Sequence, residues 1–131
     1  MTSLDPAGHI KIAVVDYAKS YEFYRRLFDV LGYKGIKDSG SGAGWVTPAG
    51  FGIYIAGAEI AAKPLAHGSP GLHHLCFKAH SVDAVNKVYD TLVKSDVKIF
   101  EGPAQYPQYT ASYYAVFFAD PDGSKLEVAF Y

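Results

Sequence analysis

The sequence predicts an α+β fold in which one βαβββ unit occurs twice in tandem. A strand-and-helix pattern that starts at Gly8 recurs at His73, and a turn-and-strand pattern that starts at Thr47 recurs at Asp120. The chain has 131 residues, of which 50% are hydrophobic, and this suits a single domain over residues 1–131. Repetition of this kind makes each copy one structural unit, so we expect two tandem modules built on the same plan.

The first repeated pattern is a short apolar strand followed by an amphipathic helix. The two copies are GHIKIAVVDYAKSYEFYRRLF, which starts at Gly8, and HHLCFKAHSVDAVNKVYDTLV, which starts at His73. When the two copies are aligned from their first residues, His9 falls on His74. The repeat therefore relates two histidines that lie at the start of equivalent strands.

The second repeated pattern is a Pro-x-Gly turn before an apolar strand. Its copies are TPAGFGIYIA, which starts at Thr47, and DPDGSKLEVA, which starts at Asp120. These copies lie further apart in the chain than those of the first pattern. The second module therefore carries about eight extra residues, which we place between Glu101 and Ser112. Two matches in the same order at compatible spacings are much rarer by chance than either match alone.

Module one is predicted at about residues 8–57. Its helix begins after the N-cap Asp16, runs to about Leu31 and stops at Gly32. Its apolar face consists of Ser20, Tyr24, Leu27, Phe28 and Leu31. Its strands are predicted at about His9–Val15, Tyr33–Ile36, Gly44–Thr47 and Phe51–Ala56.

Module two is predicted at about residues 72–131, after a linker at about residues 58–71 that is rich in Pro, Gly and Ala. Ser81 caps its helix, and Val85, Val88, Tyr89 and Leu92 form the apolar stripe. Its strands are predicted at about His73–Ala79, Val97–Phe100, Tyr113–Phe118 and Lys125–Tyr131.

Successive side chains of a strand point to opposite faces of the sheet, so the sequence predicts which of them point away from the helix. Bulky aliphatic residues alternate with small or polar residues in the first and last strand of both modules. The aliphatic residues should pack on the helices, and the others should face an open side. Four equivalent positions on that open side are His9, Tyr54, His74 and Glu127.

Two imidazoles and one carboxylate can bind a divalent metal and leave further coordination positions open. We therefore predict His9, His74 and Glu127 as metal ligands. Open positions admit a substrate or water, which a catalytic metal requires. These ligand types suit iron(II), manganese, nickel or zinc without selecting one of them.

Three further residues on the same face, and Trp45 on a middle strand, have two interpretations each. Tyr54 either acts as a hydrogen-bond donor, acid or base, or only fills the fourth ligand position. Cys76 is more simply a small filler in a substrate pocket than a nucleophile. Lys11 either holds an anionic substrate or lies on the surface. Trp45 either forms a wall of the substrate pocket or belongs to the core.

The stretch from Gly102 to Tyr114 contains four tyrosines and is predicted to be a long loop. Long loops in compact domains are often functional, so it is predicted to form a lid or pocket wall. Tyr109 and Tyr113 are the predicted substrate contacts, with Tyr113 also a catalytic candidate. The alternative is an aromatic contact in a homodimer.

The remaining histidines are not predicted ligands. His73 should face away from His74 by alternation, and His67 and His80 should be solvated near loop ends.

Composition excludes several function classes. The formal net charge is −1 without a basic stripe, which argues against nucleic-acid binding. No apolar run approaches the roughly 20 residues of a membrane span. The single cysteine, Cys76, excludes an internal disulfide. The segment from Met1 to Pro6 lacks the apolar core of a signal peptide, so we expect a cytoplasmic protein.

Three segments, GHIKIAVVD, GLHHLCFKA and FFADPDGSKLEVAF, resemble the vicinal oxygen chelate superfamily, which includes glyoxalases, bleomycin resistance proteins and extradiol dioxygenases. The resemblance covers nearly the whole chain and implies paired βαβββ modules that form a curved sheet around a metal cavity. It also implies ligands at His9, Tyr54, His74 and Glu127, of which Tyr54 departs from the usual Glu or Gln. Tyrosine is a poor ligand because its pKa near 10 keeps it protonated.

The resulting prediction is a metal-dependent enzyme that acts on a small oxygenated substrate. Dioxygenase-like chemistry is preferred, because a site of two His and one carboxylate leaves room for substrate and dioxygen. Glyoxalase-like or epimerase-like isomerisation, lyase chemistry and thiol transfer use the same scaffold. The alternative class is a protein that binds an antibiotic or metabolite without turnover, and its members usually lack the metal ligands. In either case a homodimer is expected.

Overall fold

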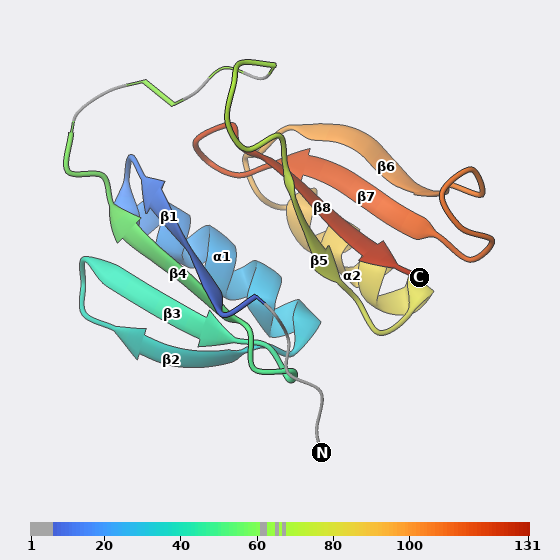
Figure 1. The fold of residues 1–131 in the computed structure, drawn as a ribbon, viewed down its shortest axis with the longest axis horizontal. Coiled ribbons are helices and arrows are strands. Elements are labelled where there is room, and N and C mark those ends of the chain that lie inside the picture. Colours follow the sequence, from blue (N-terminus) through green and yellow to red (C-terminus); the bar gives the residue numbers. More distant parts are fainter. Residues whose placement is uncertain (1–6, 61–62, 65, 67) are drawn as a thin grey trace. The chain divides into compact units, whose positions relative to one another are not determined.

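The computed structural model describes residues 7–60, 63–64, 66 and 68–131. The chain divides into two compact units, Met1–Ala61 and Ala62–Tyr131, and the division falls within the stretch 58–71. Each unit contains one helix and a four-stranded sheet in the order βαβββ (Figure 1). The predictions for Met1 to Pro6 and for His67 lie outside the described residues.

The first unit has the strand order β1-β4-β3-β2, in which β1 is parallel to β4 and the other pairs are antiparallel. A bulge interrupts the β2–β3 pairing between Gly35 and Lys37. The elements are β1 (His9–Val14), α1 (Tyr17–Leu31), β2 (Lys34–Asp38), β3 (Gly42–Val46) and β4 (Gly52–Gly57).

The second unit repeats this topology with the strand order β5-β8-β7-β6, in which β5 is parallel to β8. The elements are β5 (Leu75–Lys78), α2 (Val82–Leu92), β6 (Ile99–Gln105), β7 (Tyr114–Ala119) and β8 (Lys125–Phe130).

Strand register confirms the repeat predicted from the sequence. In the parallel pair of the first unit, Lys11 lies opposite Tyr54. In the parallel pair of the second unit, Cys76 lies opposite Glu127. The first repeated pattern aligns Lys11 with Cys76, and the second repeated pattern aligns Tyr54 with Glu127. The two units therefore share one backbone plan and one register.

Both helices begin at the predicted capping residues. The Asp16 side chain accepts a hydrogen bond from the backbone N–H of Lys19, and the Ser81 side chain accepts one from Ala84. Gly32 ends α1 in the left-handed conformation with φ of 77°, which glycine adopts without steric cost. The predicted apolar face of α1 is buried as well, and includes Phe23 in addition.

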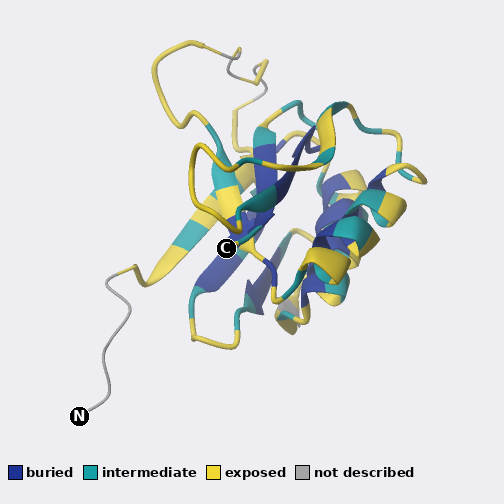
Figure 2. Ribbon diagram, turned by 90° about the vertical axis from the view of Figure 1, so that its right-hand side faces the viewer, coloured by how far each residue is buried: buried dark blue, intermediate teal, exposed yellow. Residues whose placement is uncertain are grey.

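The helix faces that contact the sheets are buried, whereas their outer faces are exposed (Figure 2). In β4 and β8, the aliphatic side chains predicted to pack on the helices are almost fully buried: Ile53, Ile55, Leu126 and Val128. Each unit thus has a core between its helix and one face of its sheet. Among the described residues, neither helix has the length and apolarity required to cross a membrane.

The repeated Pro-x-Gly turns have the same hydrogen bonds in both units. The N–H of Gly50 donates to the Thr47 carbonyl, and the N–H of Gly123 donates to the Asp120 carbonyl. Both glycines have positive φ, 94° for Gly50 and 88° for Gly123. Asp120 adds a side-chain role, because its Oδ1 accepts from the N–H groups of Asp122 and Ser124 at 2.9 Å each. This turn fixes where β8 begins.

Two of the differences from the predicted element boundaries affect the candidate site. The strand predicted to stop at Phe100 continues to Gln105, so part of the extra sequence lengthens β6 through two irregularities in its pairing with β7. The loop is therefore confined to residues 106–113. The strand predicted from His73 starts only at Leu75. His74 therefore precedes regular pairing, where alternation no longer determines side-chain direction.

Replacing the buried Asp120 with alanine should lower the free energy of unfolding by about 1–3 kcal/mol, because two backbone N–H groups lose their acceptor. Urea denaturation followed by circular dichroism measures the change. Ser124→Ala is the matched control, since the exposed Ser124 contributes its backbone and not its side chain to the turn. Equal stability of Asp120→Ala and Ser124→Ala would contradict the assigned role of the carboxylate.

Candidate functional site

The face of the second sheet that points away from α2 carries the candidate site. Glu127 on β8 lies beside Cys76 on β5 and Phe117 on β7 in the strand register. Ala115, Phe117 and Ala129 form a buried cluster on this face, and Tyr106 and Tyr113 from the loop pack against it. The loop that the extra sequence provides therefore covers the centre of this face.

Glu127 is a buried carboxylate, with 3% of its surface exposed. Both of its oxygens have partners. The Tyr113 hydroxyl donates to Oε2 at 2.5 Å, and Nε2 of His74 lies 3.2 Å from Oε1. Burying a carboxylate is costly unless it is paired and hydrogen-bonded, and these two contacts provide that compensation.

His74 contacts a second imidazole through its other ring nitrogen. Nδ1 of His74 lies 2.7 Å from Nδ1 of His73, a hydrogen-bonding distance. Alternation had predicted that His73 faces away from His74, which is wrong, because both residues precede the regular strand. Glu127, His74 and His73 therefore form a continuous row of polar contacts, and sequence reasoning missed its last member.

The electrostatic environment keeps Tyr113 protonated. Desolvation and then the hydrogen bond to Glu127 raise the pKa of the Tyr113 hydroxyl well above its ordinary value of 10.0. Its proton is therefore held on the tyrosine and directed at the carboxylate across the neutral pH range. Tyr113 can position Glu127 or donate a hydrogen bond, but it is a poor base.

Cys76 is similarly unsuited to nucleophilic chemistry. Desolvation by its surroundings and then the negative charge of Glu127 raise the pKa of the Cys76 thiol to about 12, although the residue retains solvent exposure. Only the thiolate is an effective nucleophile, so this environment favours the interpretation of Cys76 as a filler.

Four tyrosines extend from the site toward solvent. The Tyr113 ring stacks on Tyr131 with 4.6 Å between ring centroids. Tyr109 meets Tyr113 edge to face at 5.2 Å and stacks on Tyr106 at 5.7 Å. Tyr109 and Tyr131 are its exposed members, at 59% and 47%, so their rings are accessible to solvent at this face.

The equivalent position in the first unit is occupied by the Tyr54 ring. Added Cβ atoms at Gly44 and Gly52 would lie 2.7 Å and 2.9 Å from that ring, which means that it lies flat against the sheet. His9 packs against it edge to face, with 5.6 Å between ring centroids. Tyr54 is therefore accommodated by two glycines that leave space for its ring.

Of the other predicted site residues of the first unit, Lys11 lies opposite Tyr54 in the strand register, whereas Trp45 lies on β3. Trp45 is 4% exposed and packs against Phe28 of α1, which matches its interpretation as a core residue. Lys11 is exposed on β1, the edge strand of its sheet. The substrate-binding roles of Lys11 and Trp45 stay predictions.

A histidine nitrogen and a carboxylate oxygen of the second unit are spaced like neighbouring ligands of one metal ion. Two ligand atoms that bind one metal at about 2.1 Å and at right angles are about 3 Å apart. The Nε2 atom of His74 and the Oε1 atom of Glu127 are separated by 3.2 Å. Within the described residues, no group of three or more His, Cys, Asp or Glu is arranged as a complete metal site. The second unit by itself thus offers two donors.

Known proteins resemble this chain over nearly its whole length. It is 28% identical over 121 residues to the uncharacterised protein YqjT of Bacillus subtilis, a match that covers 92% of this chain and 94% of YqjT. It is 25% identical over 132 residues to the virulence protein STM3117 of Salmonella typhimurium, which covers 98% of this chain and 85% of that protein.

Solved structures share the fold. A glyoxalase/bleomycin resistance protein from Albidiferax ferrireducens superposes with a TM-score of 0.74 at 24% identity, with 95% of this chain and 97% of that chain covered. A glyoxalase/dioxygenase from Nostoc punctiforme gives a TM-score of 0.76 at 22% identity, with 99% and 97% covered.

The family comparison agrees with the fold and with the segments that suggested it. Residues 7–128 match the family described as the Glyoxalase/Bleomycin resistance protein/Dioxygenase superfamily. That range includes both βαβββ units up to Val128 of β8, and with them His74, Tyr113 and Glu127 of the candidate site. This chain therefore belongs to the glyoxalase/bleomycin resistance protein/dioxygenase superfamily.

Proposed function

We propose that this protein is a divalent-metal-dependent enzyme that acts on a small oxygenated substrate at the Glu127 face of the second unit. The observation that carries the proposal is the buried Glu127 carboxylate with Nε2 of His74 at 3.2 Å. An imidazole nitrogen and a carboxylate oxygen at this separation can share one cation. His9, in the first unit, stays the predicted third ligand.

Each of the two metal ligands proposed in the second unit, Glu127 and His74, has a hydrogen-bond partner that fixes its orientation. Tyr113 donates to Oε2 of Glu127, which leaves Oε1 directed at His74. When Nε2 of His74 binds a cation, the ring proton is on Nδ1 and needs an acceptor, and Nδ1 of His73 lies at 2.7 Å. Partners of this kind commonly fix the tautomer and raise the affinity of metal ligands.

A metal held here would polarise a coordinated substrate oxygen and stabilise negative charge on it. The side chains of this protein would contact the substrate, exclude water and hold the metal ligand in place. The tyrosines around Tyr113 would contact the apolar part of the substrate and exclude water, and the Tyr113 hydroxyl would keep the carboxylate in place. We prefer dioxygenase-like chemistry over isomerisation, because isomerisation needs a proton-transfer base and Tyr54 is a poor substitute for a carboxylate in that role.

A second candidate function is the binding of an aromatic ligand without turnover. It is favoured by the exposed aromatic group Tyr106, Tyr109, Tyr113 and Tyr131. Metal content separates this candidate from the enzyme, since binding without turnover does not require a cation. The expected homodimer and cytoplasmic location stay predictions.

The full chain should bind close to one equivalent of iron(II), manganese, nickel or zinc, measured by elemental analysis after removal of loosely held metal. His74→Ala and Glu127→Gln should each reduce occupancy severalfold, because each removes a donor. His9→Ala tests the predicted third ligand in the same way.

The matched control is His80→Ala, because His80 is an exposed histidine of the same unit that makes no contact with Glu127. Wild-type protein that takes up none of the four metals would refute the metal-dependent enzyme. Full occupancy in His74→Ala would show that the ligands have been assigned incorrectly.

His73→Ala should weaken zinc binding by about tenfold or more, because His74 loses the acceptor for its Nδ1 proton. Isothermal titration calorimetry of metal-free protein measures the affinity. His73→Asn should recover part of the loss, since its amide oxygen can accept the same proton. An affinity for His73→Ala equal to that of His80→Ala would rule out this role for His73.

Cys76 should react with iodoacetamide roughly 10³-fold more slowly than a free thiol at pH 8, because its raised pKa of about 12 leaves very little thiolate. The rate should increase steadily as the pH rises toward 12. Mass spectrometry measures this rate cleanly because the chain has one cysteine. Protein unfolded in urea is the control, and equally fast labelling of the folded protein at pH 8 would revive the nucleophile interpretation.

A further inference from the structure

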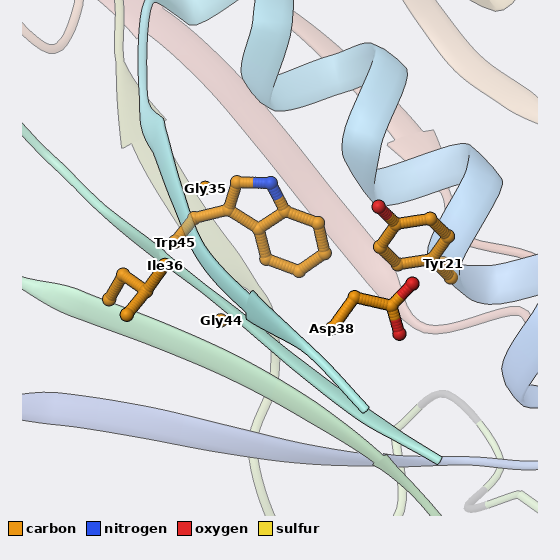
Figure 3. Close-up of a pocket in the computed structure, with 6 residues that line it drawn as sticks. All are labelled: Tyr21, Gly35, Ile36, Asp38, Gly44 and Trp45. Carbon is orange, nitrogen blue, oxygen red and sulfur yellow. The ribbon is translucent and has the colours of Figure 1, made fainter. Parts of the chain in front are cut away.

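The first unit contains a pocket that is separate from the Glu127 face of the second unit. It has a volume of about 240 Å³ and lies where the N-terminal half of α1 meets the hairpin of β2 and β3. Six residues line it: Tyr21, Gly35, Ile36, Asp38, Gly44 and Trp45 (Figure 3). Two aromatic rings and one carboxylate thus border a space that is left open next to Trp45 by the absence of a side chain at Gly35.

The aromatic side of the pocket is held firmly. The rings of Tyr21 and Trp45 are stacked, with 5.9 Å between centroids and 27° between planes. Phe28 packs against Trp45 at 5.1 Å from within the core. Trp45 is 4% exposed, so its position is set by packing and does not depend on a ligand. A ligand would meet a preformed aromatic surface.

The acidic side of the pocket is also fixed. Oδ1 of Asp38 accepts from the Tyr17 hydroxyl at 2.5 Å and from the Gly40 N–H at 2.8 Å. Among the described residues, the hydrogen bonds to this carboxylate fall on Oδ1, which leaves Oδ2 available to a ligand. Both donors favour the charged form and lower the pKa of the Asp38 carboxyl. Figure 3 shows the carboxylate beside the rings of Tyr21 and Trp45.

The two glycines that line the pocket are present for different structural reasons. Gly44 is required by the Tyr54 ring, since an added Cβ would lie 2.7 Å from it. Gly35 has no such constraint, because its φ is not positive and an added Cβ would make ordinary contact with Trp45 at 3.8 Å. Glycine inside a strand is destabilising, and it often marks a bulge or the close approach of a ligand. A side chain at Gly35 would occupy the space next to the indole N–H of Trp45.

We propose that this pocket binds a small organic cation, with its ammonium group at Asp38 and its apolar part against Trp45 and Tyr21. A carboxylate next to aromatic rings suits a cation with attached carbon atoms better than a metal ion or an anion. The volume is below the roughly 300 Å³ of typical ligand pockets, so the ligand is limited to about one ring with a short arm. This site is independent of the proposed metal site.

The test uses benzylammonium as the probe and benzyl alcohol as its neutral counterpart. The chain contains one tryptophan, so a ¹⁵N–¹H spectrum of the full protein has a single indole N–H signal, which reports on this pocket. Benzylammonium should shift that signal saturably at neutral pH. Benzyl alcohol should bind at least about threefold more weakly, because it lacks the charge that pairs with Asp38.

Three variants locate the site. Gly35→Val should abolish saturable binding by filling the space beside Trp45. Asp38→Asn should weaken benzylammonium binding about threefold to fivefold and leave benzyl alcohol binding unchanged. Asp29→Asn removes the same charge from an exposed position of α1 that does not line the pocket, so binding should stay at the wild-type level.

The proposal is overturned if neither probe shifts the indole signal saturably, or if Gly35→Val binds as well as wild type. It is also overturned if Asp29→Asn weakens binding as much as Asp38→Asn, since the charge effect would then be nonspecific. If Gly35→Val does not give the spectrum of a folded protein, Gly35→Ala takes its place and should still weaken binding. Metal content of the protein has no bearing on any of these outcomes.

Discussion

The parallel pairing of the first and last strand in each unit is the constraint on which the rest of the structure depends. It brings together residues that are far apart in the chain, so that Lys11 lies opposite Tyr54 and Cys76 lies opposite Glu127. Parallel strands need a long connection, which here consists of a helix and two further strands. Because the helix covers one face of the sheet, the residues of the candidate site lie on the other face.

The second unit carries a buried acidic residue on that face. A carboxylate at position 127 is buried at the centre of the sheet, which would be unfavourable without partners. One partner, His74, comes from the segment before β5. The other, Tyr113, comes from the loop that the first unit lacks. The extra sequence of the second unit and the acidic residue at its centre thus depend on each other.

The first unit has the same backbone plan with different chemistry. Tyr54 stands where the second unit has Glu127, and Gly44 and Gly52 provide the space for its ring to lie on the sheet. That ring offers His9 an aromatic neighbour where the second unit offers His74 a carboxylate. A shared fold therefore carries different side-chain environments in its two copies, which is why function has to be argued from each site.

The sequence by itself determined the order of the elements and their repetition. Alternation in the strands, the caps Asp16 and Ser81 and the repeated turns are local patterns, and the repeat related each position of one unit to its equivalent in the other. Strand order and register came from the tertiary structure. Only the tertiary structure decided that His73 turns toward His74, that β6 extends to Gln105 and that Tyr113 bonds to Glu127. These features depend on side-chain rotamers, strand irregularities and contacts between residues far apart in the chain, which local sequence patterns do not encode.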